Sequence, residues 1–165
     1  MKTLYLVRHA KSSWGQSGLS DFNRPLLDTG IRRNRKIIKY LNEKSVSVDL
    51  IISSPAVRTL ETAKLIAAGV DYPIENIYRE PALYEAGLND YLNVIYDAPD
   101  EMNSLMIVGH NFTITHVANF FLGPEIEILP TSGLVAISFD TEHWREIPSV
   151  QPEQLFVVFP KMLKP

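Results

Sequence analysis

The stretch that decides the fold reads Leu4-Tyr5-Leu6-Val7-Arg8-His9-Ala10-Lys11-Ser12. Its first part, residues 3–7, is short, continuous and rich in β-branched and aromatic side chains without helical periodicity, which predicts a buried strand. The strand ends at an Arg-His pair, and small polar residues follow. A histidine flanked by cations at a strand end is suited to binding an anion, and its imidazole can also attack one. On its own such a pair is a weak signal, so its meaning depends on the rest of the chain.

Composition and charge narrow the classes of protein. The chain has 165 residues, of which 45% are hydrophobic and 21% charged, and these values predict one globular domain spanning residues 1–165. The net charge of −3 gives no electrostatic reason to expect binding to nucleic acid or to a membrane. The absence of cysteine excludes disulfides, thiolate metal sites and cysteine nucleophiles. No window resembles a signal peptide or a membrane span, so we expect a cytoplasmic protein.

Strand and helix patterns alternate along the chain. Buried strands are predicted at 48–52 and 105–108, a short strand at 74–78, and a terminal pair of strands at 134–139 and 155–159. Helices are predicted at 28–41, 54–68, 89–96 and 114–122, the second of them capped by Ser54 with Pro55 at its first position. Residues 11–25 form a long loop. This alternation predicts an α/β fold with a mostly parallel central sheet flanked by helices.

Three of the buried strands end in polar residues. Arg8 and His9 follow the first, Ser53 and Ser54 the second with Arg58 a turn later, and His110 follows the third. Parallel sheets bind ligands outside the carboxyl ends of their strands, so two histidines and two arginines are expected to meet in one crevice. Each alone has a simpler explanation: a structural histidine, a surface arginine, a helix cap. Their joint occurrence at equivalent strand ends favours a site.

Two imidazoles with two guanidiniums suit phosphoryl transfer. A neutral imidazole is a competent nucleophile near pH 7. A guanidinium remains charged and can donate two parallel hydrogen bonds to two phosphate oxygens. It therefore stabilises the negative charge that spreads over those oxygens in the transition state. His110 also precedes a predicted helix, whose unpaired N–H groups favour an anion nearby.

Three motifs in this order resemble those of the histidine phosphatase (phosphoglycerate mutase-like) superfamily. They are Leu6-Val7-Arg8-His9-Ala10-Lys11-Ser12, Ser53-Ser54-Pro55-Ala56-Val57-Arg58-Thr59-Leu60-Glu61-Thr62-Ala63 and Val108-Gly109-His110-Asn111. Ala after the first histidine, with Asp21-Phe22-Asn23-Arg24-Pro25-Leu26, is similar to the short SixA-type members. The resemblance implies a phosphoglycerate mutase-like fold and a phosphatase. The four-residue pocket, with no cysteine ligands or acidic metal cluster in the sequence, leads us to expect that it needs no metal, and no other cofactor is expected. The glycine usual after the nucleophile is Ala10 here, and the position of the mutase-type asparagine is about Gly15, which puts mutase-style substrate contacts in doubt.

The resemblance also implies roles for individual residues. His9 is expected to be the phosphorylated nucleophile, Arg8 and Arg58 to bind the phosphoryl group, and His110 to stabilise the transition state. Glu85 in Leu83-Tyr84-Glu85 best matches the acidic residue that protonates the leaving group, and Asp21 is the alternative. Ser12, Asp21 and Arg24 are expected to bind substrate.

The short chain favours a phosphohistidine side chain on a protein as the substrate. Small phosphate esters such as sugar phosphates are the alternative, and a phosphate-binding module without activity is a third hypothesis. A histidine-liganded metalloenzyme ranks last, because two arginines repel a divalent cation. The basic helix Arg32–Lys39 is interpreted as a solvated surface rather than a docking site, and the sequence indicates neither the partner nor the oligomeric state.

Overall fold

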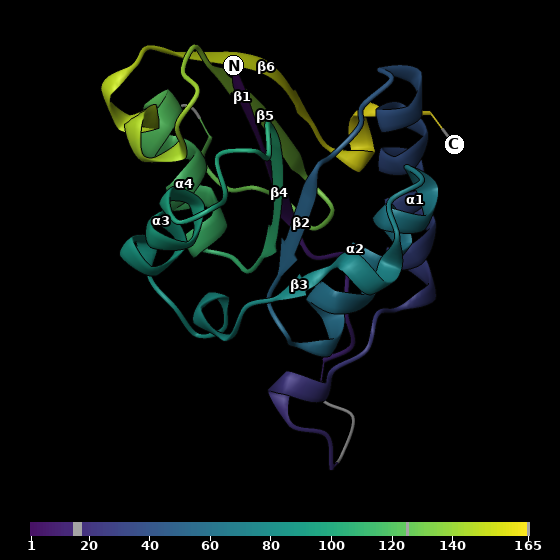
Figure 1. The fold of residues 1–165 in the computed structure, drawn as a ribbon. Coiled ribbons are helices and arrows are strands. Elements are labelled where there is room, and N and C mark those ends of the chain that lie inside the picture. Colours follow the sequence, from purple (N-terminus) through teal and green to yellow (C-terminus); the bar gives the residue numbers. More distant parts are fainter. Residues whose placement is uncertain (15–17, 125, 165) are drawn as a thin grey trace.

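The first strand of the chain lies inside the sheet, between later strands. The computed structural model describes residues 1–14, 18–124 and 126–164. In these residues, six strands form one sheet in the order β3-β2-β4-β1-β5-β6 (Figure 1). The strands in chain order are β1 (Lys2–Arg8), β2 (Leu50–Ser53), β3 (Tyr78–Arg79), β4 (Ser104–Gly109), β5 (Leu134–Phe139) and β6 (Pro152–Val158). The first four are parallel to one another, which confirms the mostly parallel sheet predicted from the sequence.

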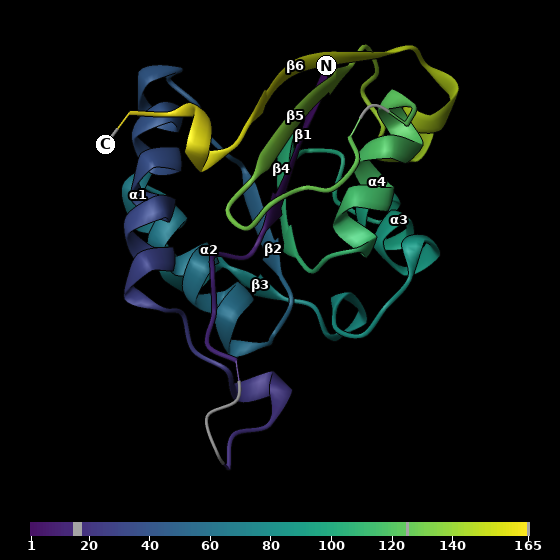
Figure 2. The same ribbon diagram turned by 180° about the vertical axis from the view of Figure 1, so that it is seen from behind.

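Helices cover both faces of this sheet (Figures 1 and 2). On one face lie α1 (Asp28–Glu43) and α2 (Val57–Gly69), and on the other α3 (Leu88–Tyr96) and α4 (Thr113–Leu122). Single turns of 3-10 helix occur at η1 (Asp21–Asn23), η2 (Ile74–Asn76), η3 (Pro81–Leu83) and η5 (Pro160–Met162), and a longer one at η4 (Trp144–Ser149). Among the described residues, no helix has both the length and the apolar character needed to cross a bilayer.

Residues 4–7 of strand β1 are all apolar because both faces of the strand are covered. Leu4 and Leu6 pack in the core under α3 and α4, whereas Tyr5 and Val7 pack in the core under α1 and α2. Successive side chains of a strand point to opposite faces, so a strand buried on both sides reads as a continuous apolar run. The run that suggested a buried strand thus serves two hydrophobic cores.

The C-terminal hairpin extends the sheet on the far side of β1. Strand β5 runs antiparallel to β1, pairing Lys2 with Phe139 and Val7 with Leu134. Strand β6 runs antiparallel to β5 and forms the edge of the sheet. The predicted terminal pair of strands is therefore confirmed.

The strand predicted at 74–78 is wrong for most of its length. Residues Ile74–Asn76 form the 3-10 turn η2, and strand β3 comprises only Tyr78–Arg79. The Tyr72 hydroxyl donates to the carbonyl of Asn76 at 2.8 Å and accepts from the Ile51 amide at 3.2 Å. These two hydrogen bonds of Tyr72 hold residues 74–76 in a turn beside β2. They outweigh the strand propensity of the residues in that turn.

The helix predicted from Ser54 begins three residues later, at Val57. The residue that directly precedes α2 is Ala56, which makes no side-chain cap hydrogen bond. The Ser54 hydroxyl accepts from the Ala56 amide at 3.3 Å, as a capping serine does, and it also lies 2.7 Å from a ring nitrogen of His110. A residue type common at helix starts is used here to hold a side chain at the end of a neighbouring strand.

We expect Gly30→Ala to destabilise the protein, although alanine in a helix is normally the more stable residue. A Cβ at Gly30 would lie 2.2 Å from the carbonyl oxygen of Lys11, because α1 packs directly against that backbone. Relieving such a collision costs about 1–3 kcal/mol. Urea unfolding measures the loss, with Arg33→Ala on the exposed side of α1 as control. A stability equal to or above that of the wild type would contradict this packing.

Candidate active site

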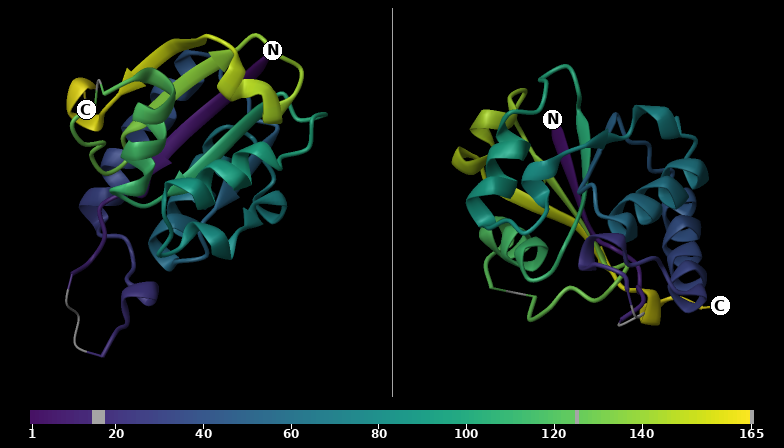
Figure 3. Two further views of the ribbon diagram at one scale, coloured as in Figure 1. Left: turned by 90° about the vertical axis from the view of Figure 1, so that its left-hand side faces the viewer. Right: turned by 90° about the horizontal axis from the view of Figure 1, so that it is seen from below.

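The carboxyl ends of three adjacent parallel strands bring the site together. Beyond the end of β1, the His9 amide donates to the carbonyl of Gly109 at 3.1 Å. Beyond the end of β2, the Ser54 amide donates to the carbonyl of Val108 at 3.1 Å. Residues that leave β1, β2 and β4 therefore start from one edge of the sheet, and Figure 3 shows the loop after β1 extending away from that edge.

His9 is buried, with 7% of its surface exposed. Its Nδ1 lies 2.7 Å from the carbonyl oxygen of Ala10. Burial is the largest influence on its pKa and brings it down to about 3, against the opposing effect of the Ala10 carbonyl. The nearby charges of Arg58 and Arg8 act in the same direction as burial. The imidazole is therefore neutral at pH 7.

His110 lies beside His9, with the ring centroids 5.6 Å apart. Its Nε2 is 2.7 Å from the Ser54 hydroxyl, and its backbone amide donates to the Tyr91 hydroxyl at 3.1 Å. Burial, followed by the charge of Arg58, lowers the pKa of His110 to about 4. Both histidines of the site are thus neutral at physiological pH.

The two arginines approach from different elements. Arg8, the last residue of β1, donates through Nη1 to the carbonyl of Leu129 at 3.0 Å. Arg58, in the first turn of α2, is only 6% exposed and donates through Nη1 to the carbonyl of Asp21 at 2.8 Å. In the described part of the chain, four buried side-chain atoms lack a hydrogen-bond partner, and three belong here: Arg8 Nε, Arg58 Nε and His110 Nδ1. Buried unpaired donors on cations are costly and suit an anionic ligand.

Asp21 links Arg58 to the loop that follows β1. One carboxylate oxygen lies 3.1 Å from Arg58 Nη2 and accepts from the Tyr84 hydroxyl at 2.7 Å. The other lies 3.0 Å from Arg24 Nη2, and Arg24 Nη1 donates to the Ser12 hydroxyl at 3.3 Å. Burial is the largest influence and raises the pKa of Asp21, but the Tyr84 hydrogen bond and the two arginines outweigh it and bring the pKa to about 2. The three residues expected to bind substrate thus form one network on Arg58.

Glu85 lies on the exposed segment between η3 and α3, with a backbone φ of 50°. Its carboxylate is near the Tyr84 hydroxyl, whose pKa is raised to about 12 by burial first, then by Asp21 and Glu85. Among the described residues, no hydrogen bond or ion pair joins Glu85 to His9 or Arg58. Gly15, the position compared with the mutase-type asparagine, lies outside the described residues.

Sequence reasoning missed several residues that hold the site in place. Thr62 accepts from the Ala10 amide at 2.9 Å and donates to the Arg58 carbonyl at 2.7 Å, so it joins the loop after β1 to α2. Tyr84 packs edge-on against His110 with centroids 5.6 Å apart. Thr62 lies one helical turn after Arg58, and that spacing could have indicated it. Tyr84 and Ser54 belong to motifs found in the sequence, but the neighbouring residues gave no indication that either side chain would contact His110.

Neutral imidazoles and guanidiniums at the carboxyl ends of parallel strands are typical of α/β enzymes that transfer phosphoryl groups. Comparison with known proteins agrees with this class. The family model of the histidine phosphatase superfamily (branch 1) matches residues 4–103. The chain belongs to this superfamily, and it is a phosphatase.

Similar proteins cover nearly the whole chain. An uncharacterised chloroplastic protein of Arabidopsis thaliana is 32% identical over 88% of this chain and 70% of its own length. A structure from Agrobacterium tumefaciens, provisionally assigned as the phosphohistidine phosphatase SixA, is 27% identical, covers 95% of this chain and 97% of its own, and has a TM-score of 0.82. The protein histidine phosphatase SixA complexed with tungstate is 18% identical, covers 98% and 99%, and has a TM-score of 0.80, so it shows the shared fold.

Proposed function

We propose that this protein is a metal-independent phosphatase that forms a phosphohistidine at His9 and acts on phosphohistidine side chains of proteins. The observation that carries the proposal is the orientation of His9. A carbonyl oxygen can only accept a hydrogen bond, so the contact with Ala10 places the ring proton on Nδ1. The Nε2 lone pair is then free to attack phosphorus, and no separate base is needed.

The first step exchanges two bonds at phosphorus. The bond from His9 Nε2 to phosphorus forms as the bond to the leaving group breaks, and a proton is delivered to the leaving nitrogen or oxygen. Arg8, Arg58 and His110 stabilise the charge on the three equatorial oxygens, which gives partners to the nitrogens that are unpaired in the free protein. In the second step, water attacks phosphorus, the bond to His9 breaks, and phosphate leaves.

The acid and base of these steps is proposed to be Glu85. Asp21 is the weaker candidate, because both oxygens of its carboxylate are already held by Arg58, Arg24 and the Tyr84 hydroxyl. Its ion pairs with Arg58 and Arg24 fit a role in orienting Arg58. A phosphohistidine substrate has a good leaving group and makes a modest demand on the acid.

Exposed aromatic side chains around the site support a protein substrate. Phe112, two residues after His110, is 66% exposed, and Trp14 is 82% exposed over the guanidinium of Arg24, 4.1 Å from the ring centroid. Exposed aromatics of this size commonly anchor protein–protein contacts. The resemblance to the provisionally assigned phosphohistidine phosphatase, at 27% identity, points to the same substrate class.

Two substrates and a chelator test the proposal. We expect faster turnover, as kcat/KM, of a phosphorylated histidine-containing carrier protein than of p-nitrophenyl phosphate, and unchanged rates in EDTA. The protein substrate is favoured by the exposed aromatic side chains of Phe112 and Trp14. Activity in EDTA is expected because the arginines supply the positive charge that a metal ion supplies in other phosphatases. The described ranges also contain no group of three or more histidine and carboxylate side chains suited to a metal ion. A preference for small esters would favour the alternative substrate class, and loss of activity in EDTA would contradict the metal-independent mechanism.

A further inference from the structure

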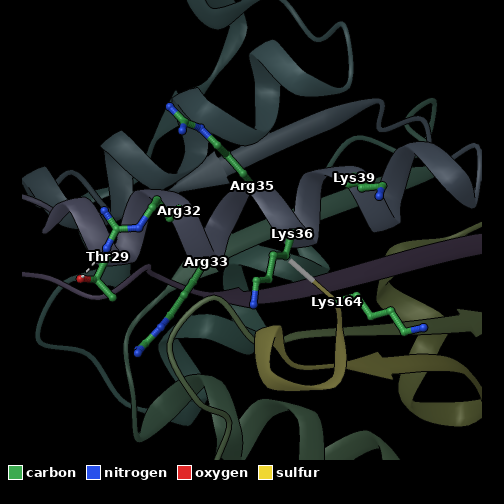
Figure 4. A pocket seen from close by; sticks show the side chains of 7 residues that line it. All are labelled: Thr29, Arg32, Arg33, Arg35, Lys36, Lys39 and Lys164. Carbon is green, nitrogen blue, oxygen red and sulfur yellow. Dashed lines mark hydrogen bonds between the residues drawn. The ribbon is translucent and has the colours of Figure 1, made fainter.

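Helix α1 concentrates positive charge in a chain that is negative overall. It carries five cations, Arg32, Arg33, Arg35, Lys36 and Lys39, against two carboxylates, which gives the helix a net charge of +3. The whole chain has a net charge of −3, so the remaining residues carry −6. Together with Lys164, these five cations line a cavity of about 500 Å³ (Figure 4). We call these six side chains the basic face.

Few carboxylates of the chain neutralise the positive charges of the basic face. Lys39 lies 3.9 Å from Glu43, but in the described part of the chain no ion pair involves Arg33, Arg35, Lys36 or Lys164. Like charges spaced three or four residues apart on a helix repel each other and destabilise the helix. The cluster lowers the stability of α1, and an anionic partner would offset that cost.

Helix α1 is joined through Ser132 to the backbone of the candidate active site. The Asn34 side chain, on α1, accepts from the Ser132 hydroxyl at 3.0 Å, and the Ser132 amide donates to the carbonyls of Arg8 and His9. Arg33 and Lys36 also line a second cavity, of about 450 Å³, with Pro130, Thr131, Phe159, Pro160 and Lys161. The turn of α1 that carries Arg33 and Lys36 thus lies beside residues 130–132, which in turn contact the backbone of Arg8 and His9.

We propose that the basic face docks an acidic surface of the phosphorylated protein whose phosphohistidine enters the site; this rests on the proposed function. Figure 4 shows Arg33 and Lys36 pointing to one side of α1 and Arg35 to the other. Arg33 and Lys36, which share one side of the helix and also line the second cavity with Lys161, therefore carry the proposed contact, and their spread along the helix suits an extended acidic surface. From Arg32 to Lys39 the helix rises about 10 Å. A nucleic acid longer than this span would meet the net negative remainder of the chain, which favours a protein partner.

Charge reversal on the face tests the docking. The double variant R33E/K36E is compared with K64E/R145E, which changes the net charge equally but lies outside the basic face. The substrates are an acidic histidine-containing phosphotransfer domain, phosphorylated at its histidine, and the small compound phosphoramidate. We expect R33E/K36E to lower kcat/KM for the carrier by about tenfold or more through KM, and to flatten its dependence on salt. Phosphoramidate turnover and the control variant should stay at wild-type values.

Each arm separates docking from catalysis. Turnover of the carrier by the wild type tests the proposed substrate class, and the ratio of the variant to the wild type tests the docking surface. Equal carrier kinetics in R33E/K36E and the wild type would overturn the docking proposal while leaving the phosphatase intact. Binding of a labelled oligonucleotide that R33E/K36E abolishes, measured by fluorescence anisotropy, would overturn the choice of an acidic protein.

Discussion

Replacing His9 by alanine is expected to lower the turnover of phosphoramidate and of the phosphorylated carrier protein by a factor of roughly 10⁴ to 10⁶. This is the range found when a catalytic nucleophile is removed. The reason is that the attacking lone pair is lost while the surrounding cations remain. The fold should persist, because the link of His9 to β4 is made by its backbone amide. Circular dichroism checks the fold, and initial rates measure the loss.

The covalent intermediate provides the decisive control for His9. Wild-type protein quenched during turnover should carry a phosphoryl group that is stable in alkali and labile in acid, as phosphohistidine is, and His9→Ala should carry none. His116→Ala, which removes an exposed histidine of α4, should behave as wild type. A fully active His9→Ala variant, or a phosphoryl group mapped to another residue, would contradict the proposed nucleophile.

Arg58→Ala is expected to lower kcat by roughly 10²- to 10³-fold, the cost of removing one preorganised donor from a developing anion. Arg58→Lys should restore little, because an ammonium cannot present the two coplanar donors of a guanidinium. The variant should also change the pH profile. Burial is the main reason that the pKa values of His9 and His110 are low, but Arg58 lowers both further. Its loss raises both values, so the acid limb of the profile should move to higher pH.

A pH series of single-turnover rates measures both effects, with Arg145→Ala as the control because that arginine is exposed and pairs with Asp97. An acid limb that stays in place would show that Arg58 does not set the charge state of the histidines. A kcat within a few-fold of the wild type would remove Arg58 from the proposed transition-state contacts.

The arrangement of the site could be predicted because it depends on strand order and strand ends. Apolar runs locate β1, β2 and β4, and the rule that parallel strands end at one edge brings Arg8, His9, Arg58 and His110 together. The resemblance to a family then supplied an expected role for each. Local periodicity is sufficient for such features, because burial on both faces leaves a continuous apolar signature.

Other features depend on contacts between distant residues and left no local signal. The Tyr72 hydroxyl that bonds Asn76 also accepts from the amide of Ile51 on β2, and this contact with a separate strand could not be seen in the local sequence, so strand propensity gave the wrong prediction at 74–76. Ser54 is a residue type common at helix starts, yet its hydroxyl also contacts His110, which follows the neighbouring strand β4. The ion pairs of Asp21 with Arg58 and Arg24 depend on the path of a loop, which composition does not determine.

The position of β1 also has a consequence for the time course of folding. This strand precedes all the others in the chain, yet its neighbours in the sheet are β4 and β5. Leu6 can therefore pair with Ile107 and Val135 only after those residues have been synthesised. During synthesis an apolar strand therefore emerges long before either of its partners exists. Pairings so distant in sequence close large loops and are formed slowly, and they leave unpaired strands open to aggregation meanwhile. His9 reaches its buried, neutral state only after β4 is in place, so catalytic competence should arise late in folding.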